Sequence, residues 1–124
     1  MFIDTEIRAF GDSIGIKNLC FNEKGCLKLI FENNENIHIE KNNDTIFFFV
    51  LKNYVLAPLP LKIYQRALTV CKNQRGFHHE IRAIAQSDND IGFLTTLSDN
   101  ECDQPTLYKL FKFLLQLVET LPEV

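Results

Sequence analysis

The residues best spaced for chemistry form the pentapeptide Gly11-Asp12-Ser13-Ile14-Gly15, which matches the G-x-S-x-G nucleophile elbow of α/β-hydrolases. That elbow needs a strand before the serine and a helix after it, so that the hydroxyl is exposed at a sharp turn. Here an amphipathic helical pattern precedes the motif, and 124 residues are too few for the parallel sheet of that fold. We interpret Gly11 and Gly15 as helix-end residues and keep a small hydrolase using Ser13 as a minor alternative.

Two other polar segments have the residue types of metal ligands. His78, His79 and Glu80 offer two imidazoles and a carboxylate, but neighbours on a strand point to opposite faces and cannot close on one ion. Residues 88–92 begin like a calcium loop, yet a glycine stands where the third ligand belongs and no glutamate closes the loop. We therefore expect no metal, no cofactor and no catalytic residue, and thus no enzyme.

The charge balance excludes one broad class of partner. The chain has 13 Lys and Arg against 16 Asp and Glu, a net charge of −3, and lacks a strongly basic cluster. A surface that follows nucleic-acid phosphates needs such a cluster, so nucleic acid is not an expected partner. No apolar run approaches the roughly 18 residues that cross a bilayer, and the first segment does not resemble a secretory signal. We expect a single cytoplasmic domain over residues 1–124, without membrane insertion.

The cysteines do not form a recognisable ligand set. Their spacing contains neither C-x2-C nor C-x4-C, the arrangements typical of zinc sites. We interpret them as reduced thiols that pack as small hydrophobes. They are Cys20, Cys26, Cys71 and Cys102.

The hydrophobic periodicity predicts the elements that position these residues. An apolar stripe through Ile3, Ile7, Phe10 and Ile14 predicts an opening helix that stops near Gly15. Two short strands flank an expected turn at 23–25, and turns at 33–36 and 42–44 continue the chain as a meander, with His38 on the solvent side of a strand.

Two helices and a hairpin complete the pattern. Prolines at 58 and 60 break the sheet before a helix over 61–73, residues 80–86 and 91–97 form a hairpin, and Asp103 is the expected N-cap of a closing helix. The order is helix, three or four strands, helix, two strands, helix. It predicts an α+β fold in which helices cover one side of an antiparallel sheet.

Two segments carry more apolar surface than one core requires. In the strand over 45–51, one face would carry Ile46, Phe48 and Val50, and the other Phe47, Phe49 and Leu51. The helix over 61–73 has one stripe of Leu61, Tyr64, Leu68 and Cys71 and another of Ile63, Ala67 and Val70. We expect core packing for Phe48, Val50, Leu61, Leu68 and Leu110 and an outward position for Phe47 and Phe49. The excess predicts that another molecule covers part of this surface.

Four stretches together carry a family resemblance. They are "GDSIGI" at the end of the first helix, "NEKGCLKLIFENNENIHIE" in the meander, "VLAPLPL" before the second helix and "LYKLFKFLLQLVETL" in the last. With the element order and the acidity of the chain, they resemble the small class I type III secretion chaperones, the CesT/SycE-like proteins. The sequence departs from this family at Arg75-Gly76-Phe77-His78-His79-Glu80, where its members have small, glycine-rich residues.

The resemblance implies a function without an ATP cycle. Such a protein forms a homodimer, or a heterodimer with a sister chaperone, and binds the extended N-terminal segment of a secreted effector or gatekeeper protein. It implies client-binding positions at Ile3, Ile7, Phe10, Phe47, Phe49 and Leu51, and dimer contacts at Ile63, Ala67, Val70 and Ile81. A small α+β regulatory dimer that binds an apolar ligand remains the alternative.

Overall fold

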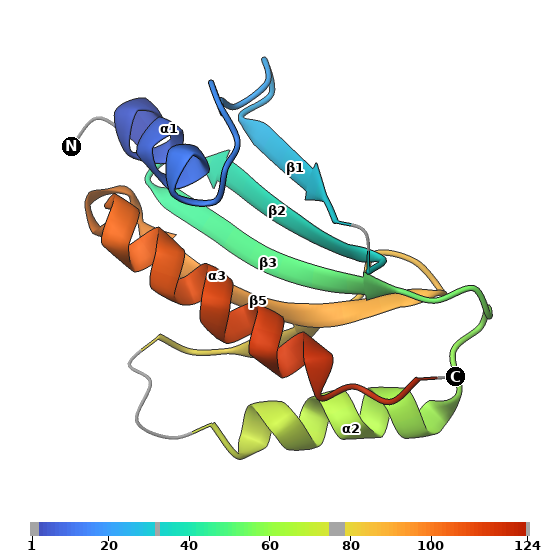
Figure 1. The fold of residues 1–124 in the computed structure, drawn as a ribbon. Coiled ribbons are helices and arrows are strands. Elements are labelled where there is room, and N and C mark those ends of the chain that lie inside the picture. The colour runs from blue at the N-terminus through green and yellow to red at the C-terminus, as the bar shows by residue number, and fades with distance from the viewer. Residues whose placement is uncertain (1–2, 32, 75–78, 124) are drawn as a thin grey trace.

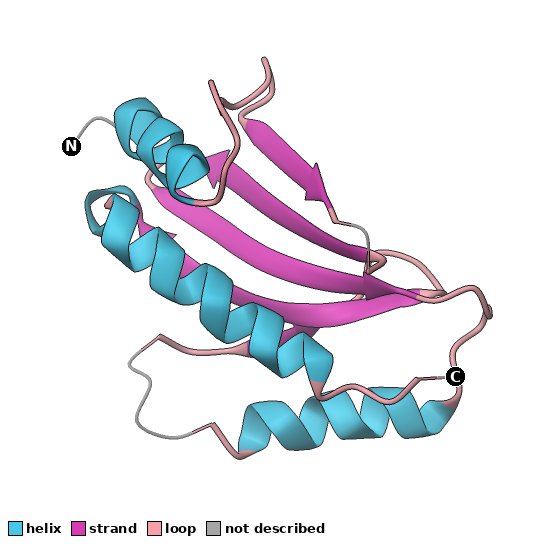
Figure 2. Cartoon of the chain, in the orientation of Figure 1, coloured by secondary structure: helices cyan, strands magenta, loops and turns pink. Residues whose placement is uncertain are grey.

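The computed structural model describes residues 3–31, 33–74 and 79–123 and contains one antiparallel sheet with three helices (Figures 1 and 2). The elements are α1 (Ile3–Ser13), β1 (Cys26–Ile30), β2 (Glu35–Asn42), β3 (Thr45–Asn53), α2 (Leu61–Lys72), β4 (Arg82–Ile84), β5 (Asp90–Ser98), a 3-10 turn (Asp99–Glu101) and α3 (Gln104–Glu119). The strand order is β1-β2-β3-β5-β4. Helices α1 and α3 lie on one face of the sheet, and α2 packs against β4 and β5. The predicted α+β order is confirmed.

The main core lies between the sheet and its helices because every second residue of the strands faces that side. Phe48 of β3 is fully buried there, and its ring meets the Phe10 ring edge to face at 6.2 Å. Phe10 in turn contacts Phe111 of α3 at 5.8 Å between ring centroids. The Glu6 carboxylate accepts a hydrogen bond from the Gln104 backbone N–H at 2.8 Å and so joins α1 to the first turn of α3.

The end of α1 explains the G-x-S-x-G match. Ser13 is the last residue of α1, and its hydroxyl donates a hydrogen bond to the Phe10 carbonyl at 2.6 Å. Gly15 has a φ of +86°, the left-handed region that glycine adopts easily after a helix. Gly11 allows a close approach, because a Cβ there would lie 2.6 Å from the Cβ of Leu19. The motif therefore ends a helix, as predicted.

The region before β1 corrects one prediction. Residues 18–25 do not form the expected first strand of a hairpin. The Asn22 side-chain oxygen accepts hydrogen bonds from the backbone N–H groups of Lys24 and Cys26, at 2.9 and 3.0 Å. This local turn uses donors that a strand would need, and Leu19 is buried against α1 in place of pairing. The turn itself, with Gly25 at a φ of +75°, is where the sequence placed it.

The later boundaries follow local signals in the sequence. Asn43 and Asp44 connect β2 to β3, and Asn43 has a φ of +56°. Asp103 caps α3 by accepting a hydrogen bond from the Thr106 N–H at 2.8 Å, which confirms the predicted N-cap. The turn before β5 is held by the Asp90 carboxylate, which accepts from the N–H groups of Gln86 and Ser87 at 2.7 and 3.1 Å. These contacts give the calcium-like segment a turn-forming role.

Candidate protein-binding surfaces

Both faces of β3 are buried, as its unbroken apolar run predicts. Phe49 and Leu51 point away from the main core, yet their exposed fractions are only 2% and 1%. The His38 ring stacks on Phe49 with 4.6 Å between centroids and an angle of 3°. Phe49 therefore faces away from the main core, as expected, but it presents no open apolar surface in the isolated chain. Phe47 is the half-buried member of the set.

The three α1 positions expected to contact a client also lie inside the chain. Ile3, Ile7 and Phe10 are buried in the main core, where they pack between the sheet and α3. Their stripe is the face that α1 needs for its own folding, because a short helix gains most of its stability from packing. In this structure they offer no surface to a second molecule.

His38 occupies an unusual place for a polar residue. It was expected on the solvent side of β2, but its exposed fraction is small and its Nε2 has no hydrogen-bond partner among the described residues. Burial, with a smaller contribution from the nearby Lys28 ammonium, lowers the pKa of His38. These surroundings favour the neutral form of the ring, which suits its stacking against Phe49.

Helix α2 exposes the stripe that was expected to be buried. Leu61 and Leu68 are 69% and 62% exposed, so their expected core packing is wrong. Ile63, Ala67 and Val70, which were expected at a dimer contact, are buried in the main core of the same chain, and so is Ile81. The sheet covers only one of two apolar stripes that lie about a third of a turn apart.

The exposed stripe continues onto the edge of the sheet. A small apolar hollow of about 190 Å³ lies between α2 and β4. It is lined by Tyr64, Leu68, Ala83, Ile84, Ala85 and Ile91. Strand β4 is also an edge strand, because among the described strands it pairs with β5 alone. The opposite edge is β1, where Ile30 is largely exposed. Unpaired strand edges are places where another chain can add a strand.

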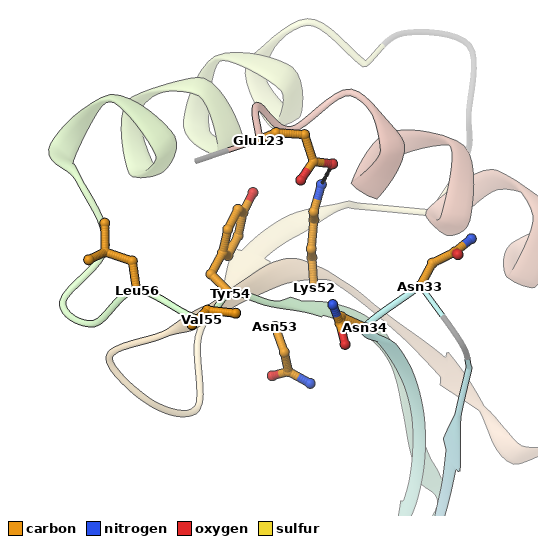
Figure 3. A pocket seen from close by; sticks show the side chains of 8 residues that line it. All are labelled: Asn33, Asn34, Lys52, Asn53, Tyr54, Val55, Leu56 and Glu123. Carbon is orange, nitrogen blue, oxygen red and sulfur yellow. Dashed lines mark hydrogen bonds and ion pairs between the residues drawn. The ribbon is translucent and has the colours of Figure 1, made fainter.

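A larger cleft lies where β3 ends, next to the C-terminal tail (Figure 3). It has a volume of about 500 Å³ and is lined by Asn33, Asn34, Lys52, Asn53, Tyr54, Val55, Leu56 and Glu123. The Lys52 ammonium pairs with Glu123 at 2.6 Å, and the Tyr54 hydroxyl donates to the Pro122 carbonyl at 2.8 Å. Val55 is fully exposed at its rim. Sequence reasoning missed this site because it interpreted "VLAPLPL" only as a break before a helix.

Among the described residues, the other groups that could do chemistry are not assembled into a site. His79 Nε2 lies 3.2 Å from Glu101 Oε2, whereas His78 is outside the described residues, as are positions 75–77 of the departure from the family pattern. Within the described ranges, no three histidine, cysteine or acidic side chains are placed to hold a metal ion. None of the helices described is long and apolar enough to cross a membrane.

The four thiols are free, and they differ in exposure. Cys102 is buried, and burial together with nearby carboxylates raises the pKa of its thiol to about 12. Cys20 is exposed, so its expected packing as a small hydrophobe is wrong. Cys102, by contrast with Cys20, is part of the core, and its thiol donates a hydrogen bond to the Ser98 carbonyl at 3.5 Å.

The fold is shared with several solved structures. A chain of the complex between the Yersinia pestis type III secretion chaperone SycH and a fragment of YscM2 matches with a TM-score of 0.70 at 17% identity, covering 97% of this chain and 99% of that one. A chain of the ExsC–ExsE complex matches with a TM-score of 0.71 at 12% identity, over 97% and 93%. A chain of the heterodimeric ExoU–SpcU complex of the Pseudomonas aeruginosa type III secretion system matches with a TM-score of 0.60 at 20% identity, over 98% of both. The fold is that of type III secretion chaperones.

The family is shown by the sequence as a whole. The family model of the type III secretory system chaperone SycN matches residues 2–121, and the chain belongs to this family. The expected resemblance to secretion chaperones is confirmed. A search of curated protein sequences gives no match.

Proposed function

We propose that this chain acts in the bacterial cytoplasm as a dimeric chaperone that binds an extended N-terminal segment of a secreted effector or gatekeeper protein before export. The observation that carries the proposal is the family match over residues 2–121. The free edges of the sheet and the exposed apolar residues support it, since an extended client binds by adding a strand and filling apolar hollows. The chain binds its client without turnover.

The dimer surface that fits best is the exposed side of α2 together with β4. Leu61 and Leu68 expose most of their surface to water, which is a solubility liability unless a partner covers it. The hollow beside Leu68 gives a second protomer, or a sister chaperone, a place for an apolar side chain. This assignment keeps α2 as the dimer helix and replaces Ile63, Ala67 and Val70 by the neighbouring stripe.

The client surface that fits best begins at the β1 edge. An added strand there would run beside Ile30, which is on the exposed outer edge of the sheet. Of the six client-binding positions expected from the sequence, Phe47 keeps accessible surface on the outer face of β3. The other five would need the chain to rearrange before they could contact a client.

The alternative of a small regulatory dimer with an apolar ligand has less support. Ligand pockets usually enclose about 300–1,000 Å³. The apolar hollow beside α2 has about 190 Å³, and the larger cleft is lined mainly by polar side chains. Neither suits an apolar small molecule.

Affinity purification of the tagged chain from its own cytoplasm tests the proposal, followed by digestion of the complex with a nonspecific protease. We expect one larger secreted protein whose N-terminal segment, a few tens of residues long, is protected. Recovery of the chain alone, monomeric and without a protected fragment, would refute the proposed function.

A further inference from the structure

The C-terminal cleft contains a second, more acidic part. A cavity of about 400 Å³ is lined by Asn33, Asn34, Glu35, Lys52, Glu119 and Glu123. It shares both asparagines, Lys52 and Glu123 with the cleft of Figure 3, so the two are continuous. Three carboxylates thus surround a single ammonium group.

The carboxylates of this cavity are unequally paired. Lys52 is committed to Glu123, whose side chain is mostly exposed at the end of the tail. Glu35 stands opposite Lys52 in the β2–β3 register and is only 7% exposed. Its carboxylate makes no hydrogen bond or ion pair within the described part of the chain, although it lines the cavity. The positive charge of Lys52 acts favourably on this carboxylate, but the Lys52 ammonium is itself paired with Glu123, so Glu35 has no ion pair of its own among the described residues.

Two further features make the cavity attractive to a positive charge. Glu119 is the last residue of α3, so the negative end of the helix dipole lies next to the cavity. Burial and the charges of Glu119 and Glu123 raise the pKa of Glu35 despite the opposing effect of Lys52, the direction expected where negative potential accumulates. Asn33 and Asn34 add amide oxygens that can accept hydrogen bonds.

The geometry favours a side chain over a metal ion. The described residues hold no three ligands close enough for a metal. A guanidinium is planar, carries five N–H donors and can bond to acceptors that lie further apart. Beside the cavity, Val55 and Leu56 expose apolar surface that a residue adjacent to an arginine could cover.

We propose that this cavity binds an arginine side chain of an extended protein segment, with Glu35 as its principal carboxylate and a neighbouring aliphatic residue against Val55 and Leu56. The inference rests on the proposed function, because it assigns the segment to a client. It adds a polar contact to what would otherwise be recognition by apolar surface alone. The Glu35 carboxylate, which has no ion pair of its own among the described residues, would then discriminate clients by charge.

A titration with a defined probe tests the cavity without a client. Nα-acetylarginine N-methylamide is added to the 15N-labelled full chain at pH 7, and the amide signals of Asn33, Asn34 and Glu35 are followed. The uncharged citrulline analogue is the ligand control. We expect saturable shifts at these residues with the arginine probe and about tenfold weaker binding in Glu35→Gln, because a charge-assisted pair is lost.

Two variants complete the design. Glu119→Gln removes an exposed carboxylate of the same cavity and is expected to weaken binding less, so it tests the cavity independently of Glu35. Glu23→Gln, in the exposed turn at the other end of the β1–β2 hairpin, should leave binding unchanged. Equal shifts with the arginine and citrulline probes, no shifts, or undiminished binding in both cavity variants would overturn the inference.

The same variants separate this inference from the proposed function. In the affinity purification, Glu35→Gln and Glu119→Gln should reduce recovery of the client relative to Glu23→Gln. A client recovered equally with all variants would leave the chaperone function standing and refute the arginine cavity. Arginine binding without any client would refute the chaperone function while supporting the chemistry of the cavity.

Discussion

The substitution Leu68→Ser on α2 gives the sharpest test of the dimer surface. Burying a whole leucine side chain is worth about 1.5–3 kcal/mol. Since the exposed fraction of Leu68 is 62%, about 1–2 kcal/mol remains to be gained at an interface. A symmetric homodimer loses the residue twice, so the dimer should weaken by about 2–4 kcal/mol, or about 30- to 700-fold in Kd. A heterodimer loses it once, which gives about 5- to 30-fold.

Sedimentation equilibrium of the purified protein over a range of concentrations measures this change. Ile30→Ser is the matched control, because Ile30 is similarly exposed but lies on the β1 edge. Circular dichroism should show that both variants keep the wild-type fold, since both side chains point to water. An unchanged dimer with Leu68→Ser, or equal weakening by both variants, would refute the assignment of α2 as the dimer helix.

Three further predictions concern the folded chain itself. A Cβ at Gly92 would lie 1.7 Å from the Val50 carbonyl oxygen, so Gly92→Ala should break the pairing of β3 with β5 and lower the Tm strongly in a thermal melt. The pKa of Glu35 is raised in the folded state, so protonation of this carboxyl group stabilises the fold. That stabilisation is present below the pKa that Glu35 has in the unfolded chain, and it is lost as the pH rises through the pKa of the folded state. Glu35→Gln should therefore be more stable than the wild type at pH 7 in urea, with the difference shrinking on acidification; a constant difference would contradict this. Cys20 should react with a thiol reagent at pH 8 while Cys102, with a pKa of about 12, stays unmodified until the chain unfolds, as mass spectrometry would show.

The sequence predicted those features of the fold that depend on neighbouring residues. Asp103 was identified as an N-cap because a short acceptor side chain before an apolar helical pattern can reach the free N–H groups. Gly15 was placed at a helix end and Asn43 in a turn, and both have the positive φ that glycine and asparagine tolerate. The missing strand before β1 shows the limit of such signals. Asn22 binds its own backbone, and a period-two pattern of apolar residues does not reveal that competition.

The surfaces were harder to predict because they depend on which elements meet. Two apolar stripes on α2 predict that both are covered, but they do not show which stripe packs against the sheet of the same chain. Ile63 faces the chain's own core and Leu68 faces water, the reverse of the expected assignment. On β3 the prediction of burial on both faces was right. The outer face, however, is partly covered by the same chain, since the His38 ring stacks flat on Phe49.

The placement of the exposed apolar residues connects the two proposed contacts. Val55 and Leu56 at the cleft are followed within a few residues by Leu61, the first residue of α2 and part of the proposed dimer stripe. A client segment seated in the cleft would contact the loop that leads into the dimer helix. If client binding favours the dimer, the client must bind the dimer more tightly than the monomer. Dimerisation then strengthens client binding by the same factor. We therefore expect a bound client to lower the dimer dissociation constant, and Leu68→Ser to weaken client binding although Leu68 lies outside the cleft.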